Sequence, residues 1–132
     1  MSRIETRESV VFFVYQTGFR SEPVEDQMKL FIDENPHIED DKEFFISSAL
    51  GVLDNRDDID AKISKYLKKW TIDRIPKLDR AILEVACYEI EHSEDVPVSV
   101  AINEAVRLSK RYGTSDSASY INGVLSAFEK NL

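Results

Sequence analysis

The sequence is poor in the residues that build disulfide-rich and β-rich proteins. Its 132 residues include one cysteine, Cys87, so no intramolecular disulfide can form and a reducing compartment is expected. Four glycines and four prolines are too few for the many tight turns of a β-sandwich or β-barrel. No stretch approaches the roughly 20 apolar residues of a membrane span, and the N-terminus has no apolar run of signal-peptide length. We therefore expect a soluble, cytoplasmic protein with no membrane association.

Residue arrangements typical of enzymes are also missing. His37 and His92 lie far apart, and no cysteine–histidine spacing predicts a metal site. Cys87 lies in a strongly apolar stretch, where a buried and unreactive thiol is expected. There is no glycine-rich phosphate loop, and the spacing of the carboxylates selects no acid–base pair. The sequence therefore predicts a binding protein rather than an enzyme, with no cofactor and no metal.

What the sequence does contain is apolar residues at helical spacing along almost its whole length. The pattern predicts helices over residues 5–17, between Pro23 and Pro36, over residues 78–90 and over residues 98–112. The helix over 78–90 is apolar on nearly every side, which is typical of the centre of a bundle. Thr114 or Ser115 is expected to cap a last helix.

A longer helical stretch follows Asp41, and its apolar residues form two stripes that are out of phase. The second stripe is Ile59, Ile63, Tyr66, Leu67 and Trp70. The phase change at residues 55–58 indicates either a kink or a junction of two helices. The whole chain, residues 1–132, is thus predicted to be one all-α domain, a compact bundle of about six or seven helices.

Charge is distributed unevenly along the chain. The formal net charge is −8, and residues 21–61 hold thirteen acidic and three basic groups, whereas residues 62–80 hold seven basic and two acidic groups. Solvated helix faces and binding surfaces both explain such a pattern.

Two groups of residues are candidates for binding nucleic acid. Arg3 and Arg7 are one helical turn apart and could clamp phosphates, although a solvated turn explains them equally well. Asp116 and Ser117 lie at the opening of the last helix, where free backbone N–H groups suit phosphate, and Tyr120 could stack on an unpaired base. Helix capping by Asp116 and core packing of Tyr120 are the alternatives.

The second half of the chain contains three sequence blocks in a fixed order. Residues 70–90 read WTIDRIPKLDRAILEVACYEI, residues 95–113 read DVPVSVAINEAVRLSKRYG, and Asp116-Ser117 is followed by YINGVL from residue 120. These blocks resemble, in order and spacing, the motifs of the NusB family of bacterial transcription antitermination factors. The resemblance is strong over residues 70–128, weak over residues 20–60, and extends to Arg7-Glu8 and Tyr15-Gln16 in the first helix.

The resemblance implies a fold of two packed helical subdomains and a function in transcription antitermination. Family members pair with NusE, a small-subunit ribosomal protein, and together grip boxA RNA in nascent ribosomal transcripts; the complex joins RNA polymerase and other Nus factors. By position, the RNA side would include Arg3, Arg7, Asp116, Ser117 and Tyr120. The side facing NusE would include Tyr15 and Asp79.

The sequence departs from the family pattern at its N-terminus, where Arg3 and Arg7 stand in place of a dense arginine cluster. We therefore expect weak binding of RNA by the chain alone and dependence on a basic partner. Two other functions remain open: a helical module that assists an RNA-modifying enzyme, and a module that associates with other proteins or with itself as a homodimer. Whether the chain is monomeric is not decided by the sequence.

Overall fold

The computed structural model describes residues 2–132, and within this range it contains seven α-helices, one 3-10 helix and no β-strand. The elements are α1 (Arg3–Thr17), α2 (Val24–Glu34), η1 (Pro36–Asp41), α3 (Lys42–Asp54), α4 (Arg56–Ser64), α5 (Lys77–His92), α6 (Val98–Tyr112) and α7 (Ser117–Lys130). The all-α prediction is confirmed. None of the helices in residues 2–132 is both long enough and apolar enough to cross a membrane.

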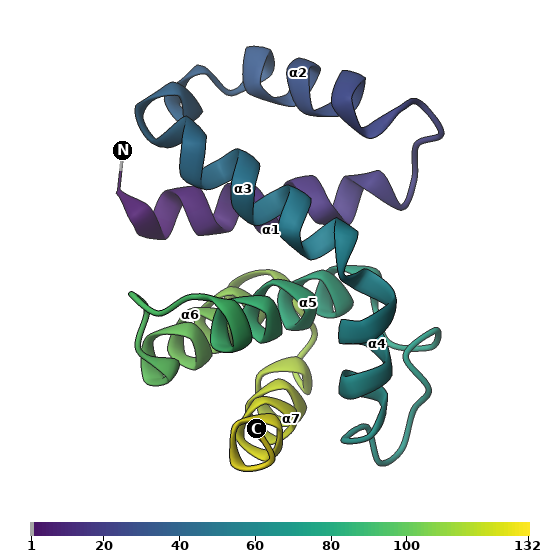
Figure 1. Cartoon of the computed structure of the whole chain (residues 1–132). Coiled ribbons are helices and arrows are strands. Elements are labelled where there is room, and N and C mark those ends of the chain that lie inside the picture. The colour runs from purple at the N-terminus through teal and green to yellow at the C-terminus, as the bar shows by residue number, and fades with distance from the viewer. Residues whose placement is uncertain (1) are drawn as a thin grey trace.

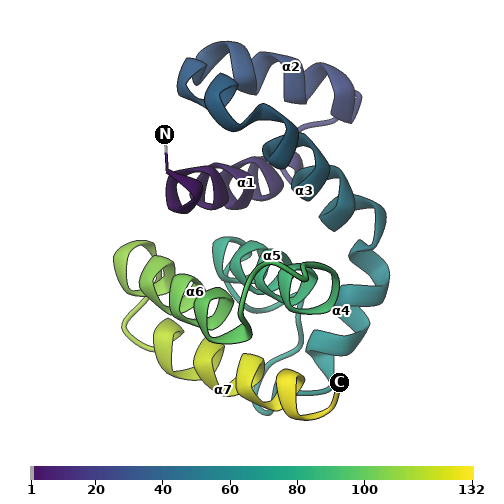
Figure 2. The ribbon, with the colours of Figure 1, turned by 60° about the vertical axis from the view of Figure 1, so that its left-hand side comes forward.

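The helices form two layers (Figures 1 and 2). One layer holds α1, α2 and α3, and the other holds α4 to α7. The layers meet where α1 and α3 pack against α5. This arrangement confirms the prediction of two packed helical subdomains.

Helix α5 is the centre of the structure, as its apolar sequence predicts. It contacts α1, α3, α4, α6 and α7. Every residue from Ala81 to Cys87 is buried. Burial raises the pKa of the Cys87 thiol, so a structural, unreactive cysteine is the result.

The helix boundaries follow from local sequence signals. The hydroxyl of Ser2 accepts a hydrogen bond from the Glu5 N–H at 3.2 Å, which starts α1 two residues earlier than expected. Pro23, Pro76 and Pro97 each occupy the residue before a helix. The phase change at residues 55–58 is a junction of two helices rather than a kink, because α3 ends at Asp54 and α4 begins at Arg56.

Two details of the expected helices were wrong. Helix α4 ends at Ser64, so Trp70 lies in the α4–α5 connection and is 56% exposed instead of continuing the apolar stripe. Helix α7 begins at Ser117 and not before Asp116. The Ser117 hydroxyl accepts a hydrogen bond from the Thr114 N–H at 2.9 Å, and this contact closes the turn that a cap on Thr114 or Ser115 was expected to close.

A partly buried ionic cluster joins α4 to α5. Glu84, which is fully buried, accepts hydrogen bonds from Arg56 Nε at 2.9 Å and Arg56 Nη2 at 3.0 Å. Arg80 Nη2 donates to Asp60 Oδ2 at 2.7 Å. Burial and the nearby Asp60 carboxylate raise the pKa of Glu84 to about 7, against the opposing effect of Arg56.

Glu84 gives stability a defined pH dependence. Its pKa rises from 4.5 to about 7 on folding, so the folded state holds the proton more tightly and the free energy of unfolding falls as pH rises through that window. One proton contributes a slope of up to ~1.4 kcal/mol per pH unit. We expect Glu84→Gln to remove most of this contribution, as measured by thermal unfolding at about pH 5.5 and about pH 7.5.

The control is Glu22→Gln. The Glu22 side chain is 50% exposed, and within residues 2–132 its one ion pair is with Arg20. Burial also raises the pKa of Glu89, so a slope of the same sign remains in Glu84→Gln. If the free energy of unfolding of Glu84→Gln changed with pH as steeply as that of the wild type, the assignment of this pH dependence to Glu84 would be contradicted.

Candidate nucleic-acid interface

The start of α1 carries one exposed arginine. The guanidinium of Arg3 lies over the Phe44 ring of α3, 3.9 Å from its centroid. Arg3 Nε also donates to Asp41 Oδ2 at 2.8 Å, and the Arg3 side chain is 49% exposed. Phe44 and Asp41 therefore hold Arg3 at the surface, where its free edge can meet a phosphate.

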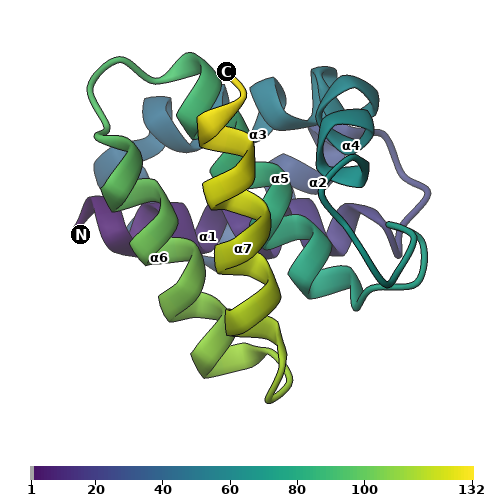
Figure 3. The same cartoon turned by 90° about the horizontal axis from the view of Figure 1, so that it is seen from below.

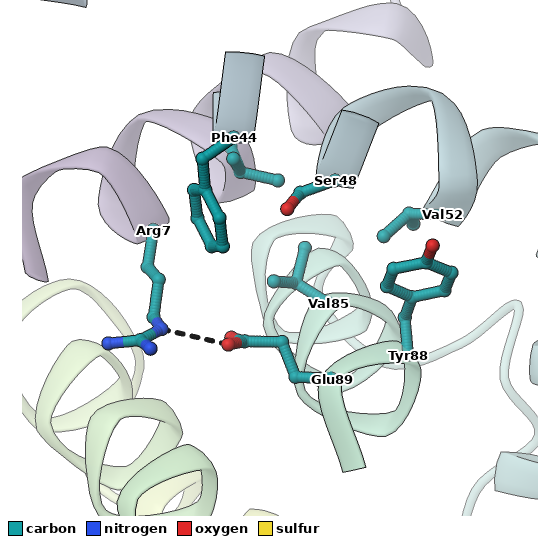
Figure 4. A pocket seen from close by; sticks show the side chains of 8 residues that line it. Arg7, Phe44, Ser48, Val52, Val85, Tyr88 and Glu89 are labelled. Carbon is teal, nitrogen blue, oxygen red and sulfur yellow. Dashed lines mark hydrogen bonds and ion pairs between the residues drawn. The ribbon is translucent and has the colours of Figure 1, made fainter. Parts of the chain in front are cut away.

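Arg7 lies in a different environment, although it is only one turn further along α1. It is 8% exposed, and its Nε donates to Glu89 Oε2 at 2.8 Å. Figure 4 shows the Arg7 side chain pointing from α1 toward Glu89 on α5, with Phe44 of α3 beside them. The two arginines do not form the exposed pair that their spacing indicated, because the turn holding Arg7 faces α5.

The beginning of α7 is built around a buried carboxylate on α5. Asp79 is fully buried, and its Oδ2 accepts a hydrogen bond from the Ser117 hydroxyl at 2.7 Å. The Tyr120 hydroxyl donates to the same oxygen. Burial and this carboxylate raise the pKa of the Tyr120 phenol. Ser117 is fully buried and Tyr120 is half-buried, whereas Asp116 is exposed.

Gly113 allows the approach of α6 to α7 at this point. A Cβ atom at Gly113 would lie 2.7 Å from the Ser109 carbonyl oxygen and 2.7 Å from Ser117 Oγ. Both distances are too short for real contacts, and one of them involves backbone that cannot move aside. The glycine that ends α6 is therefore also a packing requirement of the Ser117–Asp79 contact.

Of the two residues expected to face a protein partner, Tyr15 is partly exposed and Asp79 is buried inside the structure. The Tyr15 ring packs edge-on against Phe19, with centroids 5.0 Å apart, and Lys77 Nζ lies 4.7 Å from the Phe19 centroid. This aromatic–lysine cluster of Tyr15, Phe19 and Lys77 joins the end of α1 to the start of α5. Asp79 is two residues further along α5, but its carboxylate is directed toward α7 and not toward solvent.

The five residues expected to bind RNA thus fall into two groups. Arg7 meets α5 at Glu89, whereas Ser117 and Tyr120 meet α5 at Asp79. Ten residues of helix separate Asp79 from Glu89, a rise of about 15 Å. In Figure 3 the start of α1 lies at the left and the start of α7 lies at the bottom.

The end of α6 connects these two groups, and sequence reasoning missed it. The Tyr112 hydroxyl donates to Glu8 Oε1 at 2.6 Å, and Arg107 Nη2 lies 3.4 Å from Glu8 Oε2. Lys110 and Arg111 are exposed in the last turn of α6. The sequence held a signal for the cations, though not for the contact with Glu8, because Arg107, Lys110 and Arg111 are spaced to share one side of a helix end.

The fold and these surfaces define a helical binding protein with exposed cations on α1 and α6. The family model described as the NusB family matches residues 4–130, and the chain therefore belongs to the NusB family. The transcription antitermination protein NusB of Acetivibrio thermocellus is 38% identical over 130 residues, which cover 98% of this chain and 90% of the relative. The family indicated by the sequence motifs is confirmed.

Solved structures agree with this assignment. A structure of T. maritima NusB superimposes with a TM-score of 0.90 at 34% identity, covering 98% of this chain and 92% of that one. A chain from a complex of antitermination factors NusB and NusE with dsRNA superimposes with a TM-score of 0.86 at 24% identity, covering 100% of both chains. The second likeness concerns the fold alone.

Proposed function

We propose that this chain is a transcription antitermination factor that binds boxA RNA of nascent ribosomal transcripts together with NusE and acts on RNA polymerase with other Nus factors. The observation that carries the proposal is its relation over nearly its whole length to curated NusB antitermination proteins. The complex of NusB and NusE with dsRNA supports it, because a chain of that complex shares the fold.

RNA would run from the start of α1, past the end of α6, to the start of α7. Arg3, Lys110 and Arg111 are the exposed cations along this path. Asp116 and the accessible part of the Tyr120 ring would contact it at the far end. Arg7 and Ser117 would act mainly through neighbours, since both are buried: Arg7 by holding α1 on α5, and Ser117 by fixing the start of α7.

NusE would dock against the aromatic–lysine cluster of Tyr15, Phe19 and Lys77. Phe19 is 56% exposed, which makes it the natural apolar anchor of such an interface. Asp79 would act only through the fold, because its buried carboxylate is directed toward α7 and not toward solvent. A basic partner also suits the chain, whose net charge of −8 opposes direct binding to a polyanion.

We expect the chain alone to bind boxA RNA weakly and the mixture with NusE to bind at least about tenfold more tightly, because the partner adds phosphate contacts. Fluorescence anisotropy of labelled boxA RNA at two salt concentrations measures both affinities. Arg3→Ala should weaken binding in the mixture. Arg20→Ala is the matched control, since Arg20 is a surface arginine 39% exposed and paired with Glu22.

Two outcomes would contradict the proposal. One is an affinity for boxA RNA that NusE leaves unchanged. The other is equal binding of boxA RNA and of a scrambled RNA by the mixture. Binding of NusE without any gain in RNA affinity would indicate the alternative, a module for protein association.

A further inference from the structure

The connection between α4 and α5, residues 65–76, is held to the protein by some of its side chains and presents the others to solvent. We call this segment the Trp70 loop. Ile75 is buried, and Tyr66, Leu67 and Ile72 are partly buried against the core. Figures 1 and 3 place the loop beside α4, on the side of α5 away from α6 and from the start of α1.

Trp70 does not take part in this anchoring. It is the only tryptophan in the sequence, and it is 56% exposed. A large apolar ring left in solvent costs the free energy that its burial would supply, while four smaller apolar residues of the same loop are used as anchors. An exposed ring of this kind is typical of a contact surface.

The charged side chains of the Trp70 loop are mostly of one sign. Residues 65–74 contain four cations, all exposed: Lys65, Lys68, Lys69 and Arg74. The one carboxylate in this stretch, Asp73, lies 3.4 Å from Arg80 of the α4–α5 ionic cluster. The loop is therefore a cationic patch on a chain whose net charge is −8.

We propose that the Trp70 loop is a second RNA contact, in which Trp70 stacks on an unpaired base and the neighbouring lysines neutralise the adjacent phosphates. Exposed aromatic rings within a positively charged surface bind single strands in this way. A duplex keeps its base faces stacked, so the ring selects single-stranded RNA. An acidic protein segment would use the cations but would leave the Trp70 ring without a partner.

The inference goes beyond boxA recognition, because the loop lies on the opposite side of α5 from α6 and from the start of α1. It rests on the proposed function only in that the chain meets RNA. RNA held at the α1–α6–α7 path and at the Trp70 loop would be contacted on two sides of the molecule. The single tryptophan allows this contact to be observed separately from boxA binding.

The test is quenching of the Trp70 fluorescence in the full chain, alone and with NusE. The probes are single-stranded oligouridylate, its duplex with oligoadenylate, and polyglutamate. We expect saturable quenching by the single strand only. Anisotropy of labelled oligouridylate should show a loss of about tenfold for Trp70→Ala. Lys68→Gln/Lys69→Gln should weaken binding and reduce the salt dependence of log K by about 1.4.

The matched control is Lys29→Gln/Lys42→Gln, which removes two exposed lysines from α2 and α3. Thermal unfolding of each variant reports whether it is folded. Three outcomes would overturn the proposal: Trp70 fluorescence that oligouridylate leaves unchanged, equal quenching by the duplex, and quenching by polyglutamate alone. The third outcome would indicate an acidic protein partner instead. Failure of the proposed function would appear instead as a boxA affinity that does not respond to NusE, whatever residue stands at position 70.

Discussion

Replacing Arg7 by alanine is expected to lower the free energy of unfolding by about 3–5 kcal/mol, because it leaves a buried carboxylate without its cation. Arg7 is 8% exposed, and its Nε–H is hydrogen-bonded to Glu89 at 2.8 Å. Urea unfolding followed by circular dichroism measures the loss. Arg20→Ala removes an exposed arginine and should change stability by less than about 1 kcal/mol.

The pH dependence of the stability loss in Arg7→Ala provides a second test. Burial raises the pKa of Glu89, and Arg7 opposes this effect. Without Arg7, the carboxyl takes up a proton more readily, so the cost of Arg7→Ala should shrink as pH falls. A loss that stays constant with pH would contradict a role based on the Arg7–Glu89 pair.

The double substitution Arg7→Met/Glu89→Met separates structure from RNA binding. It replaces the ion pair by apolar side chains of similar length and should recover most of the stability. If Arg7 acts through the fold, the double variant binds boxA RNA with NusE as the wild type does. An Arg7→Ala protein that is as stable as the wild type but has lost RNA affinity would show direct contact instead.

Asp79→Ala is expected to cost at least about 3 kcal/mol, since it removes the acceptor of two hydrogen bonds to a carboxylate. The donors are the hydroxyls of Ser117 and Tyr120, and Asp79 is fully buried. Tyr120→Phe removes one of these bonds and should cost about 1.5–3 kcal/mol. The exposed Asp95 supplies the control, Asp95→Ala.

A double-mutant cycle tests the assignment of this contact. Adding Tyr120→Phe to Asp79→Ala should cost far less than Tyr120→Phe does alone, because the acceptor has already gone. Additive losses would show that the two residues act independently. NusE affinity, measured below the unfolding transition, should change little in Asp79→Ala; a fully stable variant without NusE affinity would place Asp79 in direct contact with the partner.

The helices could be predicted because their limits depend on neighbours in sequence. Pro23, Pro76 and Pro97 mark the starts of helices whatever the tertiary structure around them, and Gly113 marks the end of a helix. The prediction that the apolar helical stripe continues to Trp70 was wrong. Helical spacing continued by coincidence beyond Ser64, and periodicity alone does not record that the helix has ended.

The candidate site was less predictable, because it depends on which side of a helix meets another helix. Arg7, Asp79 and Ser117 are polar, and polar residues are usually exposed. Their burial depends on partners 38 and 82 positions away in sequence. A single sequence records neither contact. The link through Glu8 and Tyr112, which are 104 positions apart, was out of reach for the same reason.

The position of α5 limits how this chain can vary in length. Its Asp79 end holds the start of α7, and its Glu89 end holds the start of α1. One residue inserted between them would turn one end relative to the other by about 100°, and either the carboxylate or its partners would lose register. Insertions should therefore be accepted in the connections on either side of α5 and rejected within it, so that the helix sets the spacing of the proposed RNA path.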